Sequence, residues 1–241
     1  MPIYNNKFKN NGFTLVELSI VIVIIGLIVA GVVGGQTLVQ QAKLRNVIAD
    51  LNKWQVAINA FRLEYNALPG DFDNAAAYTL GTSGNGNRKI YSAPNEGVDA
   101  WDHLANAGLI ANSSYFTGNP GKPLTPLGEN TRYTFTYAGT DSTGGGGNHM
   151  NLAANLLYQK YTGNLIQIGG GGGAYMAGVL TVNHARSIDS KMDDGIPDAG
   201  ILYAGGGNGS QCVDTWIRNA GPISYLADNG QKVCRLLYLL K

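Results

Sequence analysis

The chain has 241 residues and a net charge of +1, and only 14% of its residues are charged. This length allows one globular domain with a sizeable core and an accessory segment. The near-zero net charge provides no field that would favour nucleic acid or an acidic substrate. Glycine is abundant at 34 residues, but its runs lack the period of collagen and therefore predict loops. The two cysteines, Cys212 and Cys234, are too few for a disulfide scaffold or a four-ligand zinc site, and suit one bridge in an oxidising compartment.

The chain begins with a short leader, residues 1–12, which contains Lys7 and Lys9 and no acidic residue. An apolar run follows at 13–33, and as a helix it would span about 30 Å, the thickness of a bilayer core. By the positive-inside rule, the leader is cytoplasmic and the rest of the chain lies across the membrane. A secretory signal peptide and a plain single-pass anchor are the alternatives. No Ala-x-Ala-like cleavage site follows the run, which argues against the signal peptide.

Glu17 argues against the plain anchor, because a carboxylate in a membrane helix costs up to about 3 kcal/mol and marks a function by default. The residues from Gly12 to Glu17 (Gly-Phe-Thr-Leu-Val-Glu), followed by an apolar run, resemble the prepilin cleavage and methylation signal of type IV pilins and type II secretion pseudopilins. The resemblance implies that prepilin peptidase cuts between Gly12 and Phe13 and that the new amino terminus is N-methylated. Residues 13 and 17 share one helix face. The Phe13 ammonium and the Glu17 carboxylate can therefore neutralise each other within or between subunits.

The helix is expected to continue beyond the membrane as an amphipathic stalk. Apolar residues recur at alternating three- and four-residue steps, which predicts a buried stripe formed by Leu44, Val47, Leu51, Trp54, Ile58, Phe61, Tyr65 and Leu68. Pro69-Gly70 ends the pattern, which argues against a long coiled coil. The predicted organisation comprises the leader (1–12), a transmembrane helix (13–35), the stalk helix (36–68) and a globular, pilin-like head (69–241).

The head is expected to be an antiparallel sheet packed against the long N-terminal helix, an α+β fold. Residues 132–137 alternate and are rich in aromatic and β-branched side chains, which is typical of a strand. Further strands are expected at 149–157, 164–168, 200–204 and 233–239.

Two helices are expected in the head. The segments around 68–75 and 101–109 resemble segments common in bacterial prepilin-type proteins, and the second reads as a helix with Asp99 as N-cap and Gly108 as its C-terminal glycine. Another helix is expected over 180–193, with its inward face formed by Val182, Ala185, Ile188 and Met192.

An acidic group lies at the end of that last helix and comprises Asp189, Asp193, Asp194 and Asp198. It does not match the EF-hand pattern, because Lys191 and Asp194 occupy the third and sixth positions. We expect a helix end, with Gly195 in the left-handed conformation and Asp189 solvated. A calcium site is the alternative, and under the helix-end interpretation millimolar calcium stabilises the head little.

The sequence shows no catalytic constellation, and no cofactor is expected: the glycine runs lack a phosphate-loop context and the three histidines lack metal-ligand spacing. We therefore expect a structural filament subunit of a type IV pilus or a type II secretion pseudopilus. Its expected partners are prepilin peptidase, the inner membrane, and itself and other pilins. The expected location is the bacterial inner membrane, with the head in the periplasm, and then the filament.

Alternatives stay open. One is a minor or tip subunit that primes assembly or binds DNA or a surface, and a more distant one is a membrane-anchored enzyme. The resemblance also implies a disulfide between Cys212 and Cys234, with two separate buried thiols as the alternative.

Overall fold

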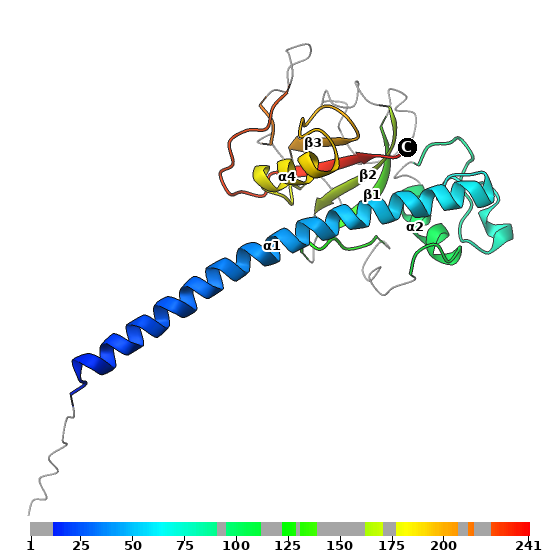
Figure 1. Cartoon of the computed structure of the whole chain (residues 1–241). Coiled ribbons are helices and arrows are strands. Elements are labelled where there is room, and N and C mark those ends of the chain that lie inside the picture. The colour runs from blue at the N-terminus through cyan, green and yellow to red at the C-terminus, as the bar shows by residue number, and fades with distance from the viewer. Residues whose placement is uncertain are drawn as a thin grey trace, which may run out of the picture. The chain divides into compact units, whose positions relative to one another are not determined.

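The computed structural model describes residues 12–90, 95–111, 122–128, 131–138, 162–170, 177–206, 212–214 and 223–241. The elements in chain order are α1 (Leu15–Tyr65), a short 3₁₀-helix η1 (Ala75–Tyr78), α2 (Glu96–Asn106), β1 (Thr131–Ala138), β2 (Gly163–Gly170), α4 (Val182–Met192), β3 (Leu202–Gly206) and β4 (Cys234–Leu239) (Figure 1). The four strands form one antiparallel sheet in the order β1-β2-β4-β3. The fold is therefore α+β, with a long N-terminal helix and an antiparallel sheet, as predicted.

The chain divides into two units, residues 1–42 and 43–241, and α1 contributes to both. In the first unit none of the described residues is buried, and the apolar side chains along α1 from Leu15 to Val39 are exposed. In the second unit α1 supplies seven buried residues: Leu44, Val47, Leu51, Trp54, Ala57, Ile58 and Phe61. Six of these belong to the predicted stripe, whose last two members, Tyr65 and Leu68, are partly buried.

An aromatic cluster joins α1, α2 and the sheet within the second unit. The ring of Trp101 on α2 lies 5.1 Å from that of Trp54 on α1 and 4.3 Å from that of Phe135 on β1 (centroid distances). The Tyr133 hydroxyl donates to the Asp50 carboxylate at 2.9 Å, which links β1 to α1. Because a buried hydroxyl needs a partner, this bond also fixes the position of the tyrosine.

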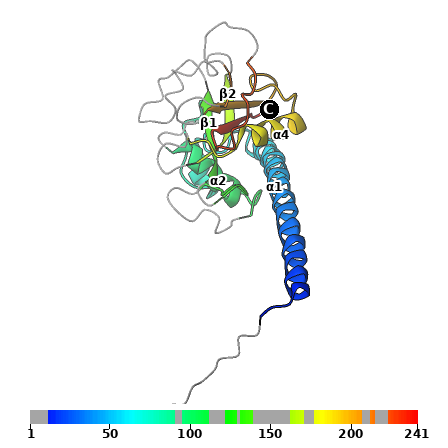
Figure 2. The ribbon, with the colours of Figure 1, turned by 90° about the vertical axis from the view of Figure 1, so that its left-hand side faces the viewer.

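The strand order determines which strand is central and which helix lies beside each end of the sheet. β2 is central: Ile166 pairs with Phe135 on one side and Tyr238 on the other. α2 contacts β1, and α4 contacts β3 and β4, so the two helices lie beside opposite ends of the sheet (Figure 2). The turn that follows α4 is thereby held next to β3.

Two helix boundaries differ from the prediction. α1 ends at Tyr65, three residues before the predicted end, because Asn66 adopts a left-handed φ of +50°. α2 begins at Glu96, so Asp99 is not the N-cap; its N–H donates to the Asn95 carbonyl at 2.9 Å inside the first helical turn. Gly108 does follow the helix with a φ of +72°, as predicted.

Three of the predicted strands, 132–137, 164–168 and 233–239, are confirmed as β1, β2 and β4 to within two residues. The strand expected at 200–204 begins later, at Leu202, because residues 200–201 belong to the turn after α4. The strand expected at 149–157 lies outside the described residues. The helix expected at 180–193 is α4, and its N-cap is Thr181, whose hydroxyl accepts from the His184 N–H at 3.3 Å.

Candidate functional site

The start of α1 is closed by a reciprocal capping arrangement between two polar side chains. The Glu17 carboxylate accepts from the backbone N–H and the hydroxyl of Thr14, both at 2.8 Å. The Thr14 hydroxyl in turn accepts from the Glu17 N–H at 3.3 Å. This is a capping box, in which the first residue and the residue three positions later satisfy each other's orphan groups. The sequence analysis missed it, although the Thr-x-x-Glu spacing is its signature.

Phe13 and Glu17, expected to interact, form no direct bond in the described structure. In the uncut chain, the nitrogen of Phe13 is a peptide nitrogen that follows Gly12 and carries no charge. A Phe13 ammonium exists only after cleavage. In the uncut chain, the Glu17 carboxylate is hydrogen-bonded by the two neutral donors of Thr14.

The expected cleavage position, between Gly12 and Phe13, is not enclosed by other described residues. A side chain at residue 12 would meet no atom within 4 Å, and Phe13 is 86% exposed. The fold of the chain therefore does not require glycine at this position.

The described part of the chain has one helix that is long and apolar enough to cross a membrane, α1, with a mean hydropathy of 2.9 over its best window. Its hydroxyl groups are satisfied within the helix, since Ser19 donates to the Val16 carbonyl at 2.8 Å and Thr37 to the Val33 carbonyl at 3.4 Å. In lipid, each polar group without a hydrogen-bond partner costs roughly several kcal/mol. Hydroxyl groups that bond to the carbonyls of their own helix therefore suit a hydrocarbon environment.

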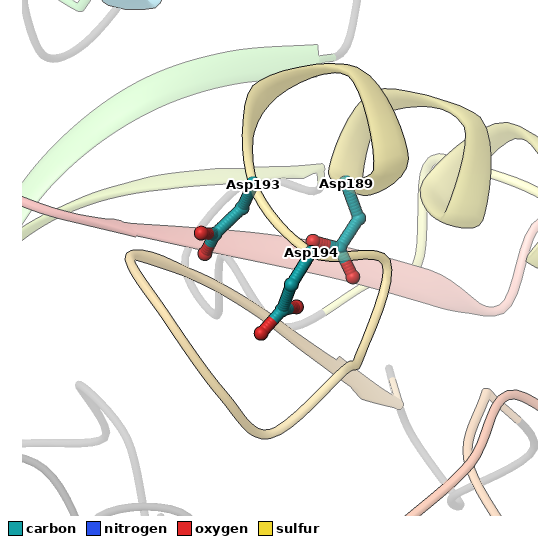
Figure 3. A group of neighbouring side chains, drawn as sticks. All are labelled: Asp189, Asp193 and Asp194. Carbon is teal, nitrogen blue, oxygen red and sulfur yellow. The ribbon is translucent and has the colours of Figure 1, made fainter.

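A second cluster lies at the end of α4, where one oxygen of each of Asp189, Asp193 and Asp194 lies within 4.8 Å of the others (Figure 3). Asp189 was expected to be solvated, but it is completely buried and accepts from the Tyr225 hydroxyl at 2.8 Å. That expectation is wrong because segment 223–226, far away in sequence, covers the helix end. Asp198 is also buried, and it is not one of the three.

The carboxylates of this cluster affect each other electrostatically. Burial raises the pKa of Asp189 to about 6, the Tyr225 hydroxyl opposes the rise, and the charges of Asp194 and Asp193 add to it. Asp193 itself accepts from the N–H groups of Ile201 and Leu202, the latter at 3.1 Å. The cluster thus connects α4 to the start of β3.

Two glycines shape this turn. Gly195 has a φ of +75°, as predicted. Gly200 has a φ of +67°, and a side chain there would collide with the Asp193 carboxylate. Both positions need glycine for the carboxylates to converge.

Cys212 and Cys234 form a disulfide, with Cα atoms 5.0 Å apart and a sequence separation of 22. Cys234 begins β4, and its carbonyl accepts from the N–H groups of Val179 and Leu180. The bridge fastens residues 212–214 to this strand, and the Leu226 N–H donates to the Cys212 carbonyl at 3.1 Å. The segment that covers Asp189 is therefore held in place next to the disulfide.

His103 is a buried structural histidine. Its Nδ1 accepts from the Gly70 N–H at 2.9 Å, so the proton lies on Nε2, which donates to the Thr82 carbonyl at 2.8 Å. Burial lowers the pKa of His103, while the bond to Thr82 and the charge of Asp102 oppose the shift. The ring therefore joins α2 to the two loops that contain Gly70 and Thr82.

Comparison with known proteins identifies the N-terminal segment. A family model described as the prokaryotic N-terminal methylation motif matches residues 7–33. No curated protein and no solved structure is significantly similar to the chain. The chain therefore carries the N-terminal motif of type IV pilin-like precursors. The match covers Gly12, Phe13, Glu17 and α1 as far as Val33, and it ends before the second unit.

Proposed function

We propose that this protein is a structural subunit of a type IV pilus-like or type II secretion pseudopilus filament. The observation that supports this most is the contrast within α1, whose first half exposes apolar side chains while its second half completes the core of the head. An apolar helical surface of that length must be covered by lipid or by other helices. A filament subunit uses both covers in turn, lipid before assembly and neighbouring helices afterwards.

Processing is proposed to occur between Gly12 and Phe13, followed by N-methylation of Phe13. The chain's own packing does not require Gly12, so the requirement for a small residue comes from the peptidase. The intact mass of the membrane-extracted protein tests this, and we expect a methylated chain that begins at Phe13. A Gly12→Leu variant should retain the leader, whereas a Gly26→Leu variant, equally unrestricted in space, should be processed normally. A mature chain that starts elsewhere would refute the proposal.

Assembly is proposed to depend on an exchange of partners at Glu17. Before cleavage its carboxylate is held by Thr14, and after cleavage a neighbouring Phe13 ammonium offers a full opposite charge. The Thr14 donors are neutral, whereas the ammonium adds the Coulomb attraction of a full opposite charge, which favours the exchange. We expect a Glu17→Val variant to be inserted and processed but largely absent from sheared filaments. Incorporation at the wild-type level would show that the pairing is dispensable.

The proposed topology places the leader in the cytoplasm and the head in the periplasm. The basic leader and the disulfide of the head support it, since disulfides persist in oxidising compartments. Protease added to spheroplasts should degrade the head and leave the N-terminal segment attached to the membrane. A protected head would contradict the proposed orientation.

A further inference from the structure

Two Asn-Gly pairs lie entirely within the described residues, and the fold gives them nearly the same local conformation. In Asn229-Gly230 and in Asn85-Gly86, the asparagine Oδ1 accepts from the N–H two residues later, at 3.0 Å and 3.1 Å. Both glycines have a left-handed φ, of +76° and +71°. Asparagine is a thermolabile residue, most of all before glycine, since no side chain hinders attack of the glycine nitrogen on the carboxamide carbon. The surroundings of each pair therefore decide whether it reacts.

The turn that contains Asn229 is open. Both residues of the pair are exposed, and a side chain at residue 230 would meet no atom within 4 Å. The bond from the Gln231 N–H closes a ring around the Gly230 peptide unit, so it holds the carboxamide folded back over that unit. Among the described residues, the Asn229 Nδ2 donates no hydrogen bond. The group that would leave as ammonia is therefore not held.

A carboxylate lies beside the nitrogen that would attack. The Gly230 N–H donates to Asp228 Oδ1 at 2.9 Å, within the reach of about 2.6–3.2 Å that a general base needs. This hydrogen bond is the main reason why the pKa of Asp228 is lowered. The carboxylate is therefore ionised at neutral pH and able to accept a proton.

The Asn85-Gly86 pair is clamped by Asp71. The Gly86 N–H donates to the backbone carbonyl of Asp71 at 2.9 Å, and a carbonyl is no base. The Asp71 side chain is buried, and its carboxylate accepts from the next two N–H groups, of Asn87 at 3.0 Å and Arg88 at 2.6 Å. The Gly86 nitrogen therefore cannot approach the Asn85 carboxamide unless this segment leaves Asp71.

We propose that Asn229 is a deamidation site of the folded head, with Asp228 as the base, and that the fold protects Asn85. The Gly230 nitrogen forms a bond to the Asn229 Cγ, and its proton passes by way of Asp228 to the amide nitrogen. The bond from Cγ to Nδ2 breaks, ammonia leaves, and a five-membered succinimide remains. Water then opens this ring at either carbonyl and gives aspartate or isoaspartate. The balance is one water consumed and one ammonia released.

The modification changes a turn that is bound to α4. Asp228 also accepts from the Asn183 N–H at 3.3 Å, in the first turn of that helix. Either product adds a negative charge, which takes the net charge of the chain from +1 to zero. Isoaspartate also lengthens the backbone between Asp228 and Gly230 by one methylene group. The product accumulates with time, so its level records the age of a molecule, and this chemistry does not depend on filament assembly.

The test incubates the full chain in detergent micelles at neutral pH and maps its peptides at intervals. Isoaspartate is detected with a protein isoaspartyl methyltransferase, and aspartate by mass spectrometry. We expect modification at residue 229 to accumulate at least about tenfold faster than at residue 85. In denaturant the two rates should converge, because neither pair is then held by the fold.

The decisive variant is Asp228→Ser, because a serine hydroxyl also accepts from the N–H two residues later but is no base near neutral pH. Deamidation at Asn229 should slow at least about fivefold. Asn85 should stay protected in this variant, which shows that the head remains folded. Asn229→Gln is the control that abolishes the reaction, since a glutamine side chain would have to close a six-membered ring.

Three results would overturn the proposal. One is a native chain in which residue 229 is not modified, or is modified no faster than residue 85. Another is a difference that persists in denaturant, which would assign it to the local sequence instead of the fold. The third is a wild-type rate at Asn229 in Asp228→Ser while Asn85 stays protected.

Discussion

The two halves of α1 are helical for different physical reasons. The first half is rich in β-branched residues, among them the run from Ile20 to Ile25, which have a lower helix propensity in water. In lipid a helix forms nevertheless, because every backbone group must be satisfied within the segment. In the second half the buried apolar residues lie along one stripe, and this half is stabilised by packing against α2 and the sheet. The surrounding lipid thus makes the first half of α1 helical, and tertiary contacts stabilise the helix in the second half.

Shortening a side chain in each half separates these causes most clearly. Phe61 is completely buried and stacks on His103 with a centroid distance of 6.0 Å, so Phe61→Ala should destabilise the head by about 3–5 kcal/mol. Ile24→Ala, in the same helix but half exposed, should leave the unfolding of the head unchanged. Denaturant unfolding followed by tryptophan fluorescence in micelles measures both. A comparable loss in the two variants would show that the units unfold together.

Removing the disulfide should affect only the second unit. Closing a loop with a sequence separation of 22 contributes about 3 kcal/mol in the chain-entropy model. A Cys212→Ser/Cys234→Ser double variant should therefore unfold at lower denaturant, while the helicity of the first half of α1 is retained. Thiol titration of the denatured, unreduced wild type checks the bridge directly, and titratable thiols would contradict it.

His103 makes the stability of the head depend on pH, while the helicity of the first unit should not change with the protonation of this residue. Its folded pKa lies below the ordinary value of 6.5, so the unfolded chain binds more protons as the pH falls below about 6.5. Neutral His103 therefore contributes to the free energy of unfolding above that pH, and this contribution is lost as the pH falls below it. The nearby Asp71, Asp99 and Asp102 have raised pKa values, chiefly through burial, and act in the opposite direction at lower pH.

A His103→Gln variant isolates this contribution, because glutamine has an acceptor and a donor but does not titrate near neutral pH. We expect it to cost about 1–3 kcal/mol at pH 7.5, from imperfect bonds to Gly70 and Thr82. The difference between wild type and variant should shrink as the pH falls from 7 to 5. A difference that is constant over this range would show that His103 does not titrate there.

The smallest effect is expected at the start of α1. Thr14→Val removes the hydroxyl of the capping box and should cost about 1 kcal/mol locally. Hydrogen exchange in micelles should show faster exchange at the first turn, including the Glu17 and Leu18 amides, with no change in the head. Thr37→Val, which removes a hydroxyl from mid-helix, should not alter exchange at the first turn.

Regular spacing made part of this fold predictable. The stripe on α1 and the alternation of β1 follow local periods, so the helix and the strands could be predicted from neighbouring residues. The end of α1 could not, because it depends on the left-handed conformation of Asn66 instead of on Pro69. The capping box is also a local pattern, since Thr14 and Glu17 stand three positions apart, although Glu17 was expected only to pair with Phe13.

The acidic cluster was the hardest to predict. An aspartate near the end of a polar helix looks solvated in sequence, and only segment 223–226 shows that Asp189 is buried. Likewise, the bonds of His103 to Gly70 and Thr82 span 33 and 21 positions. Local patterns carry no information about such contacts.

The strand order has a consequence for how the head is made. Among the described strands, β3 pairs only with β4, and β4 is inserted between β2 and β3 although it follows both in the chain. During synthesis, β1 and β2 can therefore pair early, while β3 waits without a neighbour until residues 234–239 have been made. An unpaired strand edge is prone to aggregation during that interval. Completion of the sheet is thus a late event in the folding of the newly made chain.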